Sequence, residues 1–302
     1  MKTTKELHQI LNSYAFGEIN AHVHTHLCDG APDMCVANIA ERAESAGIRL
    51  VILTPHHHKQ VTDDTASLYH DTDETIFLQL REEIERYEKE SGTVKFLLST
   101  ETDILSVSGE LSLKPSTLLE KSLDLISPTL NYHPLLPLDA VRVTHIREVD
   151  EYHTSGIFGR MADAAGGADY ILETAYRAET EAIRHSPYPA MLGHFLAAHT
   201  IPDRTHTWFG DREAQLIIMR EETKKLLEVC RAAESMIDLT GIHLRNGRTT
   251  EDQKHQDGFL YRYQCDLVEQ CRIFGIPTAP GSDAHGLGGV GESRMYDGYF
   301  GG

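Results

Sequence analysis

The sequence has few cysteines, a deficit of basic residues and no long apolar run, and each shortage excludes a class of protein. Its five cysteines form an odd set without a C-x-x-C pair, which argues against a disulfide framework and favours reduced thiols in the cytoplasm. Lys and Arg number 28 against 46 Asp and Glu, giving a net charge of −18, whereas proteins that bind long nucleic acids or anionic membranes are generally basic. No apolar run approaches the roughly 20 residues that cross a bilayer. We therefore expect a cytoplasmic protein that binds neither a membrane nor long nucleic acids.

Histidine, in contrast, is abundant, with 18 among the 302 residues. The imidazole ring is the commonest metal ligand in proteins and titrates near neutral pH, so it also serves as an acid or a base in catalysis. The positions of the histidines along the chain are therefore the most informative feature of the sequence.

Short β-like segments alternate with helical segments along the chain. The segment 49–54 (RLVILT) is apolar throughout, which is typical of a strand buried on both faces. Regular β-then-α order indicates a parallel sheet, and seven such units favour a closed or nearly closed α/β barrel, here a single domain over residues 1–302. Strands are predicted at 18–24, 49–54, 95–100, 123–127, 190–193, 236–239 and 276–279, and helices at 33–46, 73–90, 115–121, 170–184, 212–234 and 253–274.

Side chains that commonly bind metal ions follow six of the seven predicted strands. In α/β barrels the carboxyl ends of the strands form one rim, and this rim carries the active site. Residues i and i+2 of an extended segment point the same way, so His22 and His24 can project inward together. Asp283 and His285 can do the same, whereas Asp29 follows Cys28 in a segment that is also typical of a simple turn. The candidate ligands are His22, His24, Asp29, His56, Glu101, His133, His194, Asp283 and His285.

This set of donors predicts more than one metal ion. Nine donors exceed the four that a tetrahedral ion uses, which suggests two or three ions with a carboxylate that bridges some of them. Imidazoles and carboxylates without cysteine suit divalent Zn, Mn or Fe. A water molecule between two ions would have its pKa lowered toward neutrality, which would give a metal-bridging hydroxide as nucleophile.

At these residues the sequence resembles the polymerase and histidinol phosphatase (PHP) family. The first family motif, H-x-H-T followed by a turn of the form S-D-G, is similar to residues 22–25 (HVHT) and 28–30 (CDG). The second, T-D-H, is similar to residues 54–56 (TPH), where Pro55 replaces the acidic residue. The closing G-S-D-A-H is present in full at 281–285.

Further positions match the family between these motifs. The family glutamate after the third strand corresponds to Glu101, and its later histidines resemble His133 and His194. The resemblance implies a distorted TIM-like (β/α)7 barrel that binds two or three divalent ions and cleaves phosphate esters. It implies one ion held by His22, His24, Glu101 and Asp283, a second by Asp29, His56 and His285, and a third by Glu101, His133 and His194, with Glu101 as the bridge.

Two arginines and one long segment are candidates for binding the substrate. The guanidinium fork matches phosphate geometry, and the candidates are Arg160, in the irregular stretch after the fourth predicted strand, and Arg204, ten residues after His194. The segment from about 129 to 167 is too long for an ordinary connection, so we expect an insertion that covers the mouth of the site. Three divalent cations outweigh three ligand carboxylates, so an acidic protein can still bind a small anion. The predicted function is a phosphatase that acts on a small phosphomonoester, such as histidinol phosphate or a nucleotide.

Other functions stay open from the sequence. A phosphodiesterase or an exonuclease acting on short oligonucleotides would use the same ions. Hydrolysis of a C–N or lactone bond would call for a group that bridges the metals, for which Lys59 is the nearby candidate. A non-catalytic metal-binding module that regulates a partner is the third alternative, although the nearly complete donor set argues against it. The sequence does not indicate an oligomeric state.

Overall fold

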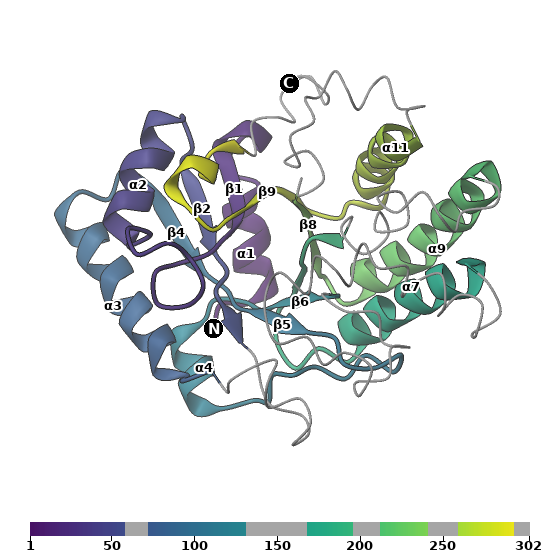
Figure 1. The fold of residues 1–302 in the computed structure, drawn as a ribbon, viewed down its shortest axis with the longest axis horizontal. Coiled ribbons are helices and arrows are strands. Elements are labelled where there is room, and N and C mark those ends of the chain that lie inside the picture. Colours follow the sequence, from purple (N-terminus) through teal and green to yellow (C-terminus); the bar gives the residue numbers. More distant parts are fainter. Residues whose placement is uncertain (58–71, 131–167, 196–211, 241–258, 293–302) are drawn as a thin grey trace.

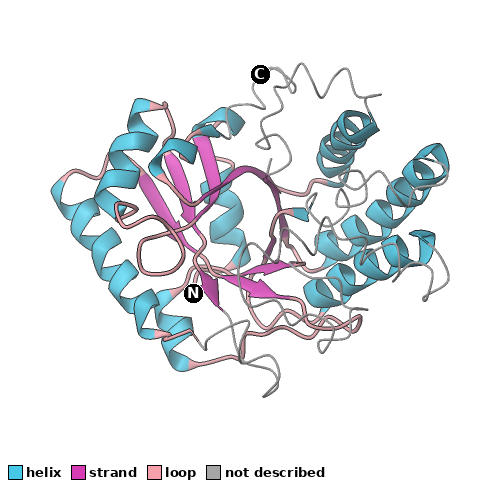
Figure 2. Cartoon of the chain, viewed as in Figure 1, coloured by secondary structure: helices cyan, strands magenta, loops and turns pink. Residues whose placement is uncertain are grey.

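Helices flank a central set of parallel strands in the computed structural model of the chain (Figure 2). The structure describes residues 1–57, 72–130, 168–195, 212–240 and 259–292 (Figure 1). Helices α2, α3 and α4 lie on one side of the strands in this view, and α7, α9 and α11 lie on the other.

Strands and helices alternate in the order predicted from the sequence. In α3 the buried residues Phe77, Leu80 and Ile84 recur at intervals of three and four, which places them on the helix face that packs on the strands. The elements are α1 (Thr4–Leu11), η1 (Phe16–Glu18), β1 (Ile19–Val23), α2 (Val36–Ser45), β2 (Leu50–Leu53), β3 (His56–His57), α3 (Thr75–Glu90), β4 (Lys95–Leu98), β5 (Glu101–Asp103), α4 (Thr117–Ser122), β6 (Ser127–Thr129), α7 (Ala168–Arg184), β7 (Met191–Leu192), α9 (Arg212–Ala232), β8 (Met236–Thr240), α11 (Phe259–Phe274), β9 (Thr278–Ala284) and η4 (Leu287–Gly289).

The strands pair in parallel through two sheets, in the orders β4-β2-β1-β9-β8-β7 and β3-β5-β6. β3 follows shortly after β2, and β5 shortly after β4, so each pair forms the two halves of one bent barrel strand. Parallel bridges from Ile126 to Ala190 and from Thr129 to Gly193 join the β6 region to the β7 region. Within the described residues, strand pairing therefore passes through seven barrel strands and returns to its start. The predicted distorted (β/α)7 barrel is confirmed.

Proline explains the bend in the second barrel strand. Pro55 lies between β2 and β3 and has no N–H to donate to a neighbouring strand. Its carbonyl accepts hydrogen bonds from the Glu101 N–H at 3.0 Å and from the Thr100 hydroxyl at 2.8 Å. The break in β2 thus coincides with the break in β4 and brings Glu101 beside His56.

The barrel interior is a small apolar core closed at one end by α1. Side chains on alternate strand positions point inward, whereas the intervening ones, such as Val51 and Leu53, pack on the surrounding helices. Thr3 caps α1 together with Glu6, and the helix inserts two leucines into the base of the barrel. The interior cluster is Leu7, Leu11, Ile19, Ala21, Leu50, Ile52, Leu97, Leu125, Met191, Met236 and Ala279.

Some predicted elements differ from the structure. Helix α1 is not predicted, although the capping box of Thr3 and Glu6 and the four-residue spacing of Leu7 and Leu11 are typical of a helix. The fourth strand, predicted at 123–127, is β6 at Ser127–Thr129. Proline usually ends a strand, but Pro128 takes part here by accepting the Gly193 N–H. The last strand, predicted at 276–279, extends as β9 to Ala284.

Most of the predicted insertion at about 129–167 lies outside the described residues, which resume at residue 168. Its position over the mouth of the barrel therefore stays a prediction, as does the single domain. Within the described part of the chain, none of the helices combines the length and apolar character that a membrane span requires.

Candidate metal centre

Eight of the nine predicted ligands converge at the carboxyl ends of the barrel strands. Each comes from a strand, from the one or two residues after it or from the loop that follows β1. His22 lies on β1, Glu101 on β5 and Asp283 on β9. The others are His24 directly after β1, Asp29 in the loop beyond it, His56 on β3, His194 two residues after β7, and His285 directly after β9.

Glu101 lies at the centre of the cluster and is almost completely buried. Its Oε2 is 3.0 Å from Nε2 of His22 and 3.2 Å from Nδ1 of His56. Its Oε1 is 2.8 Å from Nε2 of His194. The two oxygens of one carboxylate thus face different imidazoles, which is the geometry that a bridging ligand needs.

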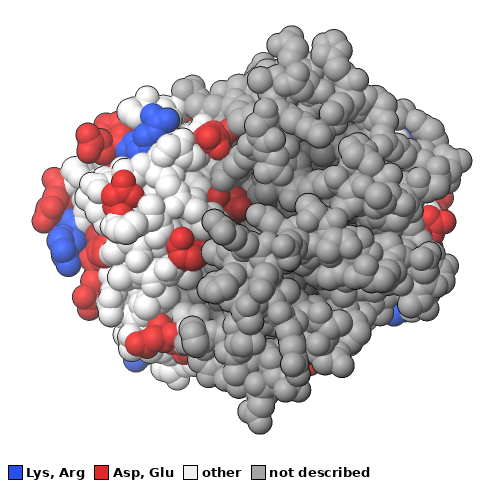
Figure 3. Space-filling view, viewed as in Figure 1, with Lys and Arg blue, Asp and Glu red and all other residues white. Residues whose placement is uncertain are grey.

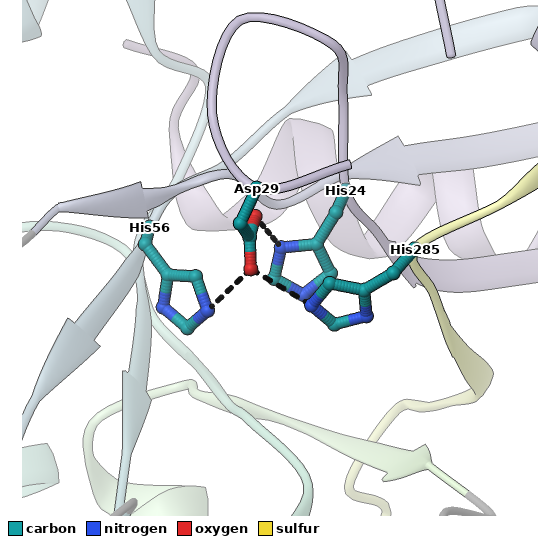
Figure 4. Close-up of side chains that lie close together, drawn as sticks. All are labelled: His24, Asp29, His56 and His285. Carbon is teal, nitrogen blue, oxygen red and sulfur yellow. Dashed lines mark hydrogen bonds and ion pairs between the residues drawn. The ribbon is translucent and has the colours of Figure 1, made fainter. Parts of the chain in front are cut away.

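Asp29 holds a second, more exposed part of the cluster. Figure 4 shows the carboxylate between three imidazoles, of which His56 lies on β3 and the other two directly follow β1 and β9. Its Oδ2 is 2.8 Å from Nε2 of His285 and 3.1 Å from Nε2 of His56, and its Oδ1 is 2.9 Å from Nδ1 of His24. The ring of His24 also stacks on that of His285, with 3.8 Å between ring centroids. The turn alternative for Asp29 therefore does not exclude a role in the cluster.

His24 connects these two parts through Asp283. Nε2 of His24 is 2.9 Å from Oδ1 of Asp283 and 3.6 Å from Oε2 of Glu101. Nε2 of His22 lies 3.9 Å from the same Asp283 oxygen. Three groups with metal-binding spacing result: His24, Asp29, His56 and His285; His22, His24 and Asp283; and His22, Glu101 and His194.

The loop that carries Asp29 is held by backbone hydrogen bonds. The N–H groups of Cys28 and Gly30 both donate to the Thr25 carbonyl, and the Ala31 N–H donates to the carbonyl of His285. A Cβ at residue 30 would lie 2.7 Å from the Thr25 oxygen, so only glycine fits this tight return. The loop therefore fixes Asp29 against the end of β9.

The backbone is strained where the ligands are. Of the residues that the structure describes, the non-glycine residues with positive φ are His22, His194, Asp283 and Glu234. Three of these four lie in the cluster, and such a conformation costs about 1–3 kcal/mol each. Strain of this kind concentrates at functional sites, where the surrounding structure holds it in place.

The strain in β1 determines where His22 points. Strict alternation would send His22 outward, because Ala21 already faces the barrel interior. The φ of His22 is 56°, and the register of β1 shifts at this position relative to both neighbouring strands. Val23 consequently packs with the outer core, and His22 and His24 both face inward. The sequence analysis predicts this direction from an unbroken strand, whereas a bulge produces it.

The carboxylates of the cluster raise the pKa of the buried imidazoles beside them. Burial by itself would lower the pKa of His24, but hydrogen bonds to Asp283 and Asp29 raise it to about 9. The pKa of His22 is likewise raised well above its usual value by Glu101 and Asp238, despite burial. The imidazoles of His56, His194 and His22 hold the pKa of Glu101 well below its ordinary value, although burial opposes this.

The donors can also hold divalent cations in place of protons. His22 faces Glu101 and Asp238 with its two nitrogens, and His24 faces Asp283 and Asp29. A protonated imidazole donates from both nitrogens, so without metal each ring can satisfy both carboxylates. A cation between an imidazole nitrogen and a carboxylate would replace the proton that joins them. Buried imidazole and carboxylate donors are also those that Zn, Mn and Fe prefer.

Four predicted residues are not placed by the structure. His133, Arg160, Arg204 and Lys59 lie outside the described residues. Their predicted roles in the third ion site, in phosphate binding and in bridging therefore stay predictions.

Sequence reasoning missed Asp238 on β8. Its Oδ2 lies 2.8 Å from Nδ1 of His22, and both side chains are fully buried. The available signal was an acidic residue in an otherwise apolar strand, because burying a carboxylate costs free energy unless it is paired.

Comparison with known proteins places this arrangement in a known fold. No family model matches the sequence, and no curated protein matches it. Among solved structures, a candidate histidinol phosphatase from Listeria monocytogenes aligns with a TM-score of 0.60 at 15% identity, over 93% of this chain and 99% of its own. The histidinol phosphate phosphatase of Lactococcus lactis, solved with zinc, L-histidinol and phosphate, aligns with a TM-score of 0.55 at 11% identity, over 93% and 92% of the two chains. The chain therefore has the fold of the histidinol phosphatases, in agreement with the PHP resemblance of its motifs.

Proposed function

We propose that this protein is a metal-dependent phosphatase that hydrolyses a small phosphomonoester. The observation that carries the proposal is the convergence of five imidazoles and three carboxylates at the barrel rim, with Glu101 between the groups. The Lactococcus protein of the same fold is described as a histidinol phosphate phosphatase and contains zinc, L-histidinol and phosphate, which supports both the metal and the substrate class. Histidinol phosphate is therefore the first substrate to test.

The described ligands would hold two or three divalent ions, of Zn, Mn or Fe. When bound, such ions supply Lewis acidity that activates water and offsets charge on the phosphoryl oxygens. One ion would be held by His22, His24, Glu101 and Asp283, a second by Asp29, His56 and His285, and a third by Glu101, His194 and His133.

The side chains of this protein prepare the site for that chemistry. The rear wall, including His22 and Glu101, is inaccessible to solvent, so electrostatic interactions there are weakly screened. Asp29 and His285 are partly exposed, so a substrate would approach the cluster from their side. Arg160 and Arg204 would bind the phosphate of the substrate, and the segment at 129–167 would select its organic part.

Capture of a phosphate requires a local field opposite to that of the surrounding surface. Acidic side chains predominate over the described part of the face in Figure 3, and the chain carries a net charge of −18. Divalent ions in the cluster would outweigh the three ligand carboxylates and create a positive site at the mouth. Small phosphomonoesters can reach such a site more readily than long polyanions, which the acidic surface repels.

The proposal is tested by metal analysis and substrate preference. The purified protein is analysed for Zn, Mn and Fe, and then assayed with p-nitrophenyl phosphate, its bis-ester and L-histidinol phosphate, with and without a chelator. We expect two or three ions per chain, and monoester turnover that disappears with the chelator and returns with metal.

A matched pair of variants separates the site from the rest of the protein. Asp283→Ala should abolish turnover, whereas Glu181→Ala, in the last turn of α7 and outside the three candidate metal groups, should leave it unchanged. Preference for the bis-ester would favour a phosphodiesterase instead. Bound metal without turnover of any ester would contradict the proposal and favour a metal-binding module.

A further inference from the structure

We propose that Asp238 is a positioning residue that sets the orientation of His22, an inference that rests on the proposed function. A carboxylate can only accept a hydrogen bond, so Nδ1 of His22 carries the proton in its 2.8 Å contact with Oδ2 of Asp238. The other nitrogen, Nε2, is then directed at Glu101 Oε2, 3.0 Å away, inside the candidate metal cluster. By holding Nδ1 outside the cluster, Asp238 leaves Nε2 as the nitrogen that His22 can offer to a metal ion.

The contacts of Asp238 separate it from the ligands themselves. Its Oδ1 accepts the Thr240 hydroxyl at 2.7 Å, and its Oδ2 accepts both the His22 ring and, at 3.4 Å, the backbone N–H of His194. Among the described residues, the three groups with metal-binding spacing do not include Asp238. Its carboxylate therefore supports the cluster from behind.

The same carboxylate stabilises two strained positions. His22 and His194 both have positive φ, and Oδ2 of Asp238 accepts a hydrogen bond from the ring of the first and from the backbone of the second. β8 lies between β7 and β9, so one side chain on β8 can reach both sides of the site. Asp238 thereby couples two imidazoles that face opposite oxygens of Glu101.

The neighbouring strand is shaped to receive this carboxylate. A Cβ at residue 281 of β9 would collide with Oδ1 of Asp238 and with Oγ1 of Thr240. Glycine at this position therefore leaves the space that Asp238 occupies. The G-S-D-A-H motif contributes in two ways: Asp283 and His285 join the cluster, and Gly281 makes room for the residue that orients His22.

A carboxylate behind a metal-binding imidazole fixes the ring and makes its free nitrogen a better ligand. Removing such a partner typically lowers metal affinity or activity by about 10–100-fold. We expect a fall of this size in zinc affinity for Asp238→Ala. Asp238→Asn keeps an oxygen that can accept the Nδ1 proton but loses the negative charge, so it should show a smaller fall.

The experiment compares three variants by competition of the whole protein with a zinc chelator. Asp124→Asn is the matched control, because Asp124 is also a buried, hydrogen-bonded carboxylate but lies outside the three candidate metal groups. It should lower the melting temperature and leave zinc affinity unchanged. A second measurement, on metal-free protein, follows the downfield NMR resonance of the His22 Nδ1 proton, which should be present in the wild type and in Asp124→Asn and lost in Asp238→Ala.

The outcomes decide between positioning and general stabilisation. Unchanged zinc affinity in Asp238→Ala, a retained Nδ1 resonance, or an equal loss of affinity in Asp124→Asn would overturn the proposal. If Asp238→Ala does not fold, Asp238→Asn decides, since its unchanged affinity together with an unshifted resonance would also overturn it. Zinc binding by the wild type without ester turnover would refute the proposed phosphatase. The zinc affinities of the variants would then still decide whether Asp238 positions His22. A wild type that binds no zinc refutes the proposed metal function, and the resonance alone then decides the role of Asp238.

Discussion

The two ends of the barrel are built on opposite principles. At the amino end, Leu7 and Leu11 of α1 complete an apolar core, and the buried carboxylate of Asp124 is matched by Arg81, Lys2 and a backbone N–H. At the carboxyl end, the interior is filled with imidazoles and carboxylates, and three ligand positions have positive φ.

This difference shows how the free energy of folding is distributed. The amino end contributes apolar burial and fully satisfied charges, which stabilise any barrel regardless of its function. The carboxyl end retains strain and crowded polar groups, which are costly unless a ligand is bound. Changes at the two ends should therefore have separable effects on stability and on metal binding.

The largest effect is expected for Glu101→Gln. The amide cannot replace a carboxylate that faces His22, His56 and His194, so metal binding should fail in more than one group. Turnover should fall by more than the roughly 100-fold that loss of a residue behind a ligand can cause. Metal content and turnover are measured together, with the exposed Glu110→Gln as control. A Glu101→Gln protein with full metal content and full turnover would show that Glu101 is not a metal ligand.

Leu7→Ala should have the largest effect on stability. Leu7 is completely buried at the base of the barrel, so its truncation should lower the free energy of unfolding by about 2–5 kcal/mol. Turnover and zinc affinity of the folded fraction should not change, because the substitution lies at the opposite end. Urea unfolding measures the first quantity and chelator competition the second. Loss of zinc affinity would show that the two ends are coupled.

Gly30→Ala should affect only part of the metal site. The added methyl group would meet the backbone of Thr25 at less than 3 Å, and relieving that contact should cost about 1–3 kcal/mol and displace Asp29. We expect weaker binding of the ion held by Asp29, His56 and His285, with the buried group intact. The number of zinc ions bound per chain at a fixed free zinc concentration shows whether one ion or all ions are lost. Gly288→Ala, where a Cβ meets no atom within 4 Å, is the control. Equal loss of all ions would show that the metal groups do not bind independently.

The smallest effect is expected at the amino end in acid. Burial would raise the pKa of Asp124, but Arg81 and the Leu98 N–H lower it below 3.8. Its stabilisation is therefore complete above pH 3.8 and is lost as the pH falls through the lower value of the folded state. Asp124→Asn should lower the free energy of unfolding by about 1–3 kcal/mol at neutral pH. Below pH 3.8 the free energy of unfolding of this variant should depend less on pH than that of the wild type. Thermal unfolding across this range provides the measurement, and an unchanged profile would exclude Asp124 as its source.

The identity of the ligands could be predicted because it depends on one general rule. In a parallel barrel the carboxyl ends of all strands meet at one rim, so polar residues after successive strands must approach one another. From the sequence alone, this rule predicts that His22, Glu101, His194 and Asp283 meet, and the structure brings them into overlapping groups. It does not extend to α1, which lies outside the β-then-α order of the barrel although its two leucines have helical spacing, or to β6, whose proline is typical of a strand end.

The sequence by itself therefore determined which chemical groups gather and at which end of the fold, because strand order and alternation are local properties of the chain. Only the tertiary structure decided how those groups face one another. The positive φ of His22 and the shift in the register of β1 depend on contacts with β2, β9 and β8, which are far away along the chain. The pairing of His22 with Asp238 joins residues 216 positions apart, and the space for it depends on a glycine in a third strand. Such relations arise from packing, which no single segment encodes.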